Sequence, residues 1–321
     1  MSSFISHLAA ELDAFLAFKR TMGHPYVRAE FTLRSFDRFV LSYSRRLRPF
    51  RLDEAILAWL ASQRKDRKPV TVTADLGAVR QFCLHRRRRD PAAFVPGRSW
   101  APQSTESEFL PFVFTDAQVR DLLRRATSLD RPPFRGVALR ALLLVLYCTG
   151  VRFGEALRLR MKDVDANGGL LFIAESKGRS RWVPFERSLG RELTQYMAAR
   201  RALVAAGPDD PFFIGADGRQ LQVKTASQVV RRLLRAAGLK PPVGRVGPRP
   251  YDFRHTFAVH RLTRWYRAGV EINARLPWLS AYMGHNDILG TETYLTATPE
   301  LLAIASQRFE RHLARRRDGN R

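Results

Sequence analysis

Apolar residues recur at helical intervals through the first part of the chain. Leucine, phenylalanine, isoleucine or valine stands every three to four positions in residues 5–22, 26–43, 52–64 and 72–89, the spacing of an amphipathic helix. No alternating pattern typical of a strand occurs among these segments. Residues 1–95 are therefore predicted to form a small all-helical domain.

The helical pattern stops in residues 90–112, "DPAAFVPGRSWAPQSTESEFLPF". Four prolines, one glycine and several small polar residues make this stretch a poor helix and a poor strand. We expect an interdomain linker at 96–112, followed by a second domain at 113–321.

The second domain mixes helical and strand patterns. Thr115 and Gln118 have the spacing of a capping box, and Gly150 follows a strongly apolar helix over 134–149. Two short apolar runs around Lys177-Gly178 predict an antiparallel hairpin. The fold class is therefore mainly α with a small antiparallel β-sheet at one edge. We expect strands at 170–174 and 181–185, a further short strand within 211–221, a short helix within 152–165, and helices at 187–206, 224–237, 252–268, 276–283 and 298–316.

The charge of the chain points to a polyanionic partner. The 55 Lys and Arg residues exceed the 30 Asp and Glu residues by 25, and only seven of the basic residues are lysines. No basic amphipathic helix stands apart, which favours nucleic acid over a membrane surface. The sequence has no apolar run of membrane-spanning length and no signal-peptide pattern at its start. Two cysteines, Cys83 and Cys148, form neither a disulfide framework nor a zinc pattern, as expected for a reducing cytoplasm.

Two arginines lie at helix boundaries. Arg152, in "CTGVRFGEALRL", either pairs with Glu155 on the surface or is held in place between two apolar helices. Arg254, in "RPYDFRHTFAVHRL", clusters with Tyr251 and His255 at the start of a helix, where amide donors and the helix dipole can seat a phosphate. The alternative there is an ordinary helix start, with an aspartate complementing the dipole.

Tyrosine chemistry on phosphorus would use such arginines. Tyr294 follows His285 by nine residues in the polar stretch "GHNDILGTETYLTATPE". A phenol, with a pKa near ~10, becomes a useful nucleophile when cations stabilise the phenolate and the transition state. Arginines can neutralise the phosphate oxygens, and a lysine such as Lys177 at a hairpin tip can protonate the departing oxygen. The sequence thus contains the parts for cleaving DNA without a metal or cofactor.

The motifs "TGVRFGEAL", "SKGRSRWVPF", "YDFRHTFAVH", "MGH" and "TETYL", in this order, resemble the tyrosine recombinase (phage integrase) family. The resemblance spans about 113–310, and the helical 1–95 region looks like the family's core-binding domain. It implies a DNA recombinase, integrase or transposase whose two domains clamp double-stranded DNA, working as a homo-tetramer on two DNA sites in the bacterial cytoplasm, associated with the nucleoid. The implied catalytic residues are Arg152, Lys177, Arg254, His285 and Tyr294, with Glu155 orienting the site.

Two departures from the family pattern affect this interpretation. Tyr251 stands where the family usually has histidine or lysine; it is expected to donate to a phosphate oxygen, while His255 is a structural neighbour. The segment between Arg254 and His285 is longer than usual and resembles transposon-borne recombinases, some of which work with sister recombinases. The rival readings are an accessory DNA-binding subunit that cleaves weakly or not at all and a type IB topoisomerase. The family's C-terminal helix often docks into a neighbouring subunit.

Overall fold

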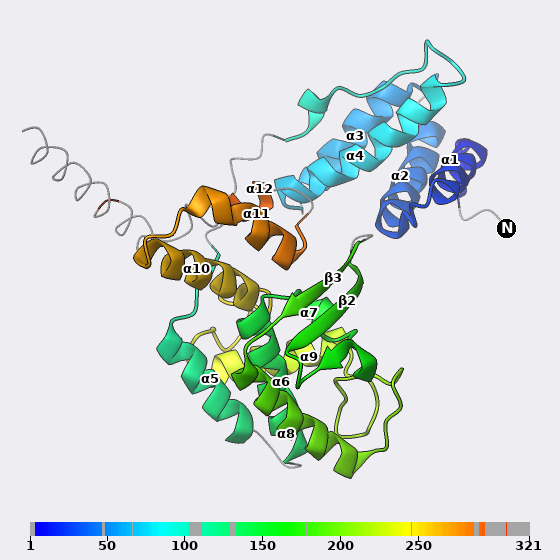
Figure 1. Ribbon diagram of the computed structural model, residues 1–321. Coiled ribbons are helices and arrows are strands. Elements are labelled where there is room, and N and C mark those ends of the chain that lie inside the picture. The colour runs from blue at the N-terminus through cyan, green and yellow to red at the C-terminus, as the bar shows by residue number, and fades with distance from the viewer. Residues whose placement is uncertain are drawn as a thin grey trace, which may run out of the picture. The chain divides into compact units, whose positions relative to one another are not determined.

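The structure is a computed structural model in which the chain forms two compact units, Met1–Phe109 and Leu110–Arg321 (Figure 1). Each unit has its own apolar core. Among the described residues, no helix is long and apolar enough to cross a membrane. The structure describes residues 4–46, 49–65, 67–102, 111–128, 133–176, 179–244, 246–285, 289–292 and 306.

The first unit is a helical domain, as predicted. The second and fourth helices pack against each other, and the core is filled by Phe15, Phe36, Trp59 and Phe82, all essentially inaccessible to solvent. The fourth helix begins at Pro69, ahead of the predicted start, because proline suits the first turn of a helix. The helices are α1 (Ala9–Thr21), α2 (Val27–Arg46), α3 (Leu52–Arg64), α4 (Pro69–Arg87) and the 3-10 turn η1 (Arg98–Trp100).

The second unit is built around α6 (Phe134–Thr149), which packs against the preceding helix, α8 and α10. The predicted capping box is present: the amides of Thr115 and Gln118 each bond to the other's side chain, at 2.9 and 3.2 Å. The remaining helices are α5 (Asp116–Ser128), α7 (Phe153–Ala156), η2 (Met161–Asp163), α8 (Arg187–Leu203), α9 (Val223–Ala236), α10 (Asp252–Arg267), α11 (Ile272–Met283) and α12 (Leu289–Glu292).

A three-stranded antiparallel sheet lies in the second unit, confirming the fold class. Its order is β1 (Val164–Asp165), β2 (Leu170–Ser176) and β3 (Arg179–Pro184), with Phe172 opposite Trp182. The turn at residues 177–178 and the helix expected at 298–316 lie outside the described residues, apart from residue 306.

Three predictions about elements were wrong. Besides the predicted hairpin, the sheet contains β1 and not the strand that was expected within 211–221. In 211–221 the buried apolar run enters a glycine-containing turn and forms only isolated bridges. The helix expected within 152–165 is limited to α7, and η2 and β1 follow it. Helix α11 begins at Ile272 rather than 276, because the Glu271 side chain caps its N-terminus, and Pro277 lies inside it.

Candidate active site

Two helices end close together, each with a glycine in the left-handed conformation. Gly150 ends α6 with φ +62°, and Gly284 ends α11 with φ +69°. A β-carbon at Gly150 would lie 2.3 Å from Phe257, and one at Gly284 would lie 2.6 Å from Nη1 of Arg181. Both positions therefore require glycine for conformation and for space.

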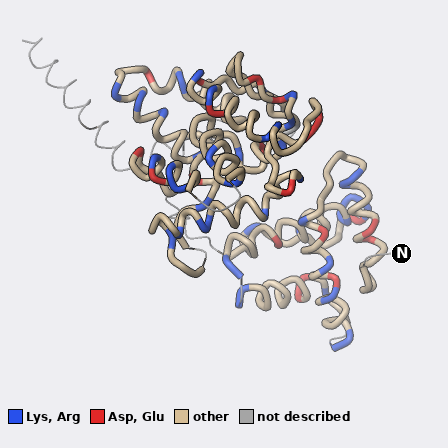
Figure 2. Tube along the Cα trace, turned by 90° about the horizontal axis from the view of Figure 1, so that it is seen from below, with Lys and Arg blue, Asp and Glu red and all other residues tan. Residues whose placement is uncertain are grey.

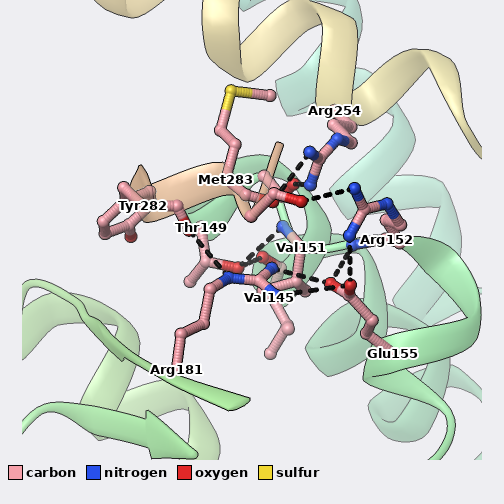
Figure 3. Close-up of polar contacts among 11 residues, drawn as sticks. Val145, Thr149, Val151, Arg152, Glu155, Arg181, Arg254, Tyr282 and Met283 are labelled. Atoms are coloured by element: carbon pink, nitrogen blue, oxygen red, sulfur yellow. Dashed lines mark hydrogen bonds and ion pairs between the residues drawn. The ribbon is translucent and has the colours of Figure 1, made fainter. Parts of the chain in front are cut away.

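Three consecutive carbonyls at the end of α11 each accept a hydrogen bond from a different arginine (Figure 3). Unpaired carbonyls make a helix C-terminus partly negative, which favours cations there. Three guanidinium groups from separate elements thus meet directly before His285. The pairs are Arg181 Nε with Tyr282 O at 2.9 Å, Arg254 Nη2 with Met283 O at 2.8 Å, and Arg152 Nη2 with Gly284 O at 2.6 Å.

The carboxylate of Glu155 balances part of this positive charge. It is 1% exposed and accepts from Nη1 of Arg152 at 2.7 Å and from Nη2 of Arg181 at 2.8 Å. The backbone amide of Arg152 also donates to it, at 2.8 Å, which satisfies the amide that precedes α7. Arg152 is paired with Glu155, but the pair is largely buried and not on the surface, so the interpretation of an arginine held in place is the one that fits. Removing a buried charge of this kind would leave its partners uncompensated.

Arg254 joins the ends of both helices. It lies in the first turn of α10, is 1% exposed, and donates from Nη1 to Gly150 O at 2.7 Å in addition to its bond with Met283. Asp252 is the acidic residue in the first turn of α10, where a carboxylate complements the helix dipole, as the alternative from sequence proposed. It accepts from the Arg249 amide at 2.6 Å, and among the described residues no side chain caps the start of this helix.

Tyr251 and His255 lie one turn apart at the start of α10. Tyr251 is 39% exposed, and its ring meets that of His255 edge to face with centroids 4.9 Å apart. Burial lowers the pKa of His255 to about 4, against an opposing effect of Asp252. His255 is therefore neutral at physiological pH.

His285 follows Gly284 directly. Its Nδ1 lies 2.6 Å from Oγ1 of the buried Thr291 in α12, and its amide donates to Ser280 O at 3.0 Å. The structure thus brings Arg152, Glu155, Arg254 and the backbone that leads into His285 together. Lys177 and Tyr294 lie outside the described residues.

Arg181 is a member of this cluster to which the sequence analysis assigned no role. It stands opposite Ile173 in the sheet, on the same side of β3 as the buried Val183. A charged residue at an inward-facing strand position is the signal that could have identified it.

Tyr282 is not available as a nucleophile. Its ring stacks on Phe257, its hydroxyl donates to Pro184 O at 2.8 Å, and burial raises its pKa. In the part of the chain that the structure describes, no group of three or more His, Cys, Asp or Glu side chains could hold a metal ion.

Comparison with known proteins identifies the family. The Phage integrase family profile matches residues 113–300. A putative integrase/recombinase, y4rB of Sinorhizobium fredii, is 33% identical over 292 residues, which are 88% of this chain and 92% of that protein. The tyrosine recombinase XerC of Mycobacterium sp. strain KMS is 30% identical over 260 residues, 79% of this chain and 81% of XerC.

A solved structure supports the fold. The Tn1549 transposon integrase in complex with transposon right end DNA superposes with a TM-score of 0.69 at 16% identity, over 94% of this chain and 98% of that chain. Together with the sequence matches, this places the chain in a known class. It belongs to the phage integrase family of tyrosine recombinases, enzymes that cleave and rejoin DNA.

Proposed function

We propose that this chain is a site-specific DNA recombinase or transposase that cuts duplex DNA through a 3′-phosphotyrosyl link at Tyr294. The observation that supports it best is the convergence of Arg152 and Arg254 on successive carbonyls, directly before His285. Of the three residues that the family resemblance assigns to one phosphate, Arg152 directly precedes α7, Arg254 lies in the first turn of α10, and His285 follows the end of α11. The two arginines bond the carbonyls that come directly before His285, which supports the proposal.

In the proposed reaction, the phenolate oxygen of Tyr294 attacks the scissile phosphorus. The bond from phosphorus to the 5′-oxygen of the next nucleotide breaks, and Lys177 gives that oxygen its proton. A 5′-hydroxyl from the partner duplex then attacks the phosphotyrosine, returns its proton to Lys177 and releases the tyrosine as a phenolate. Each step exchanges one phosphoester bond for another, so the cycle needs neither ATP nor a metal.

The proposed clamp consists of Arg152 and Arg254, with His285 and Tyr251 donating hydrogen bonds to the phosphate. A guanidinium has five N–H donors, so holding one or two carbonyls is compatible with contacting a phosphate. Loss of one of the two clamping arginines is expected to cost ~2.7–4 kcal/mol of transition-state stabilisation.

Duplex DNA is the proposed partner, bound by a homo-tetramer spanning two sites, with the two domains of each subunit clamping the duplex. The net charge of +25 supports a DNA partner, and Figure 2 shows Lys and Arg in both units. Solved relatives of the same fold include the XerH site-specific recombinase bound to its difH substrate, with a TM-score of 0.67 at 17% identity. Strand exchange between two sites, each cut on both strands, uses four tyrosines.

A second candidate is an accessory subunit that binds DNA and cleaves it weakly or not at all. The observation that favours it is Tyr251, which is 39% exposed and occupies the family's usual histidine or lysine position. A phenol is a poor general base at neutral pH.

A covalent trapping assay tests the proposal. The protein is incubated in EDTA with nicked duplexes from the DNA that flanks its coding sequence, and the products are separated on a denaturing gel. We expect a slower-migrating protein–DNA band that disappears in Tyr294→Phe. The band should persist in Tyr282→Phe, because the hydroxyl of Tyr282 bonds Pro184 O in the wild type. A band that survives Tyr294→Phe refutes the proposed nucleophile. If the wild-type protein binds this DNA but forms no covalent band, the accessory-subunit function is favoured.

A further inference from the structure

We propose that Arg181 is a positioning residue for the cleavage reaction: it fixes the turn that carries His285 relative to Arg152 and does not itself contact the DNA. This inference rests on the proposed function. All three guanidinium nitrogens of Arg181 face protein oxygens: Nη2 and Nη1 lie 2.8 and 3.4 Å from Glu155, and Nε lies 2.9 Å from Tyr282 O. The side chain is 12% exposed.

The contacts of Arg181 connect three elements of the site (Figure 3). The residue lies on β3, its carboxylate partner lies on α7 beside Arg152, and its carbonyl partner is near the end of α11. The guanidinium also lies directly against Gly284, where an added β-carbon would be 2.6 Å from Nη1 and 2.7 Å from Cζ. Arg181 therefore sets the spacing between the α7 carboxylate and the turn before His285.

Displacing this turn would displace two groups of the proposed clamp at once. Gly284 O bonds Nη2 of Arg152, and the next residue is His285. A misplacement of about 1 Å in a catalytic group can lower a rate by roughly a hundredfold. Lysine cannot replace Arg181, because one ammonium at the end of a flexible stem does not provide the planar fork that reaches both Glu155 and Tyr282.

The first test compares Arg181→Lys and Arg181→Gln with the wild type. Arg140→Lys is the matched control, since Arg140 holds Glu192 through Nε and Nη2 at 2.9 and 2.5 Å, between α6 and α8. We expect both Arg181 variants to form the covalent adduct about a hundredfold more slowly in a single turnover. DNA affinity, measured by fluorescence anisotropy, should change by less than about threefold, because no phosphate contact is lost. Arg140→Lys should match the wild type in both measurements.

A second substrate separates positioning from a general loosening of the fold. If the scissile phosphate is replaced by a neutral methylphosphonate, Arg152 has no oxyanion charge to neutralise, so its displacement matters less. The rate of adduct formation by Arg181→Lys, relative to the wild-type rate on the same substrate, should then be at least tenfold less impaired. This corresponds to a transition-state destabilisation that is smaller by about 1.4 kcal/mol. A deficit of equal size on both substrates means a structural role only and overturns the inference.

Gly284→Ala perturbs the contact between Gly284 and Arg181 from the glycine side, and it replaces the Arg181 variants in the test if those do not fold. Its β-carbon pushes the Arg181 guanidinium away, so we expect the same slow adduct formation and the same methylphosphonate pattern. A wild type without a Tyr294 adduct refutes the proposed function and the inference with it. A normal wild-type adduct together with an unchanged rate in Arg181→Lys refutes only the inference.

Discussion

Helices α6 and α10 touch where Gly150 meets Phe257: a β-carbon on the glycine would lie 2.3 Å from Cδ1 of the phenylalanine. The same glycine has φ +62° and offers its carbonyl to Nη1 of Arg254, one turn before Phe257 on α10. The close approach of the two helices is therefore what lets a fully buried arginine reach the end of α6.

Gly150→Ala is expected to lower both stability and cleavage. The left-handed conformation alone costs a non-glycine residue ~1–2 kcal/mol, and the clash with Phe257 adds to that cost. Gly269→Ala is the matched control, because Gly269 has φ +74° with nothing within 4 Å of the added β-carbon. Urea unfolding should show a larger loss for Gly150→Ala than for Gly269→Ala. Equal losses would mean that the approach of α6 to α10 does not limit this position.

Glu155→Gln should destabilise the second unit strongly, because the guanidinium groups of Arg152 and Arg181 lose their buried counter-charge. Removing one partner of a buried pair typically costs ~3–5 kcal/mol. Glu192→Gln is the comparison: this carboxylate pairs with Arg140 while 29% exposed, and such pairs contribute ~0–1 kcal/mol. Urea unfolding of both variants checks the difference, and a loss below 1 kcal/mol in Glu155→Gln would contradict it.

Much of the fold follows from the local pattern, because helical periodicity depends on neighbouring residues. The order of the short motifs predicted that Arg152, Arg254 and His285 share one site, and the structure has the two arginines bonded to the carbonyls directly before His285. Arg181 was missed because its partners are 26 and 101 residues away, so no local spacing reveals them. Strand β1 was missed because two residues are too few to show an alternating pattern. What could not be predicted thus depends on long-range contacts.

The stability of the protein should fall as the pH decreases from ~6.5, the ordinary histidine pKa, to about 4, the pKa of His255 in the folded chain. Burial keeps this imidazole neutral, so the unfolded chain takes up the proton first, and proton uptake favours unfolding. Urea unfolding across this range should show a shallower pH dependence in His255→Gln. The same change at the exposed His24 is the control for the substitution itself.

DNA affinity should decrease steeply with salt. If subunits neutralise about six to ten phosphates, the affinity falls by roughly 10³–10⁵ between about 50 and 200 mM salt, because binding releases condensed counterions. Fluorescence anisotropy with a labelled duplex measures the slope. A nearly flat slope would contradict a phosphate-dominated interface and would leave the charge of +25 without a role in binding.

Tyr251 provides the sharpest test of how this chain departs from its family. The exposed phenol lies at the start of α10, against the ring of His255. If it donates one hydrogen bond to the phosphate, Tyr251→Phe should slow single-turnover cleavage by at least about tenfold, since a hydrogen bond to a charged group contributes ~1.5 kcal/mol or more. Tyr251→His restores the family residue and should cleave faster than the wild type, with a new dependence on pH near ~6.5.

Anisotropy should show equal DNA affinity for the wild type, Tyr251→Phe and Tyr251→His, because one hydrogen bond among many phosphate contacts changes little in binding. Equal cleavage rates for all three proteins would mean that this side chain does not reach the reacting phosphate. If the wild type does not cleave and Tyr251→His does, the natural chain is the accessory subunit, and its proposed clamp of Arg152 and Arg254 is intact.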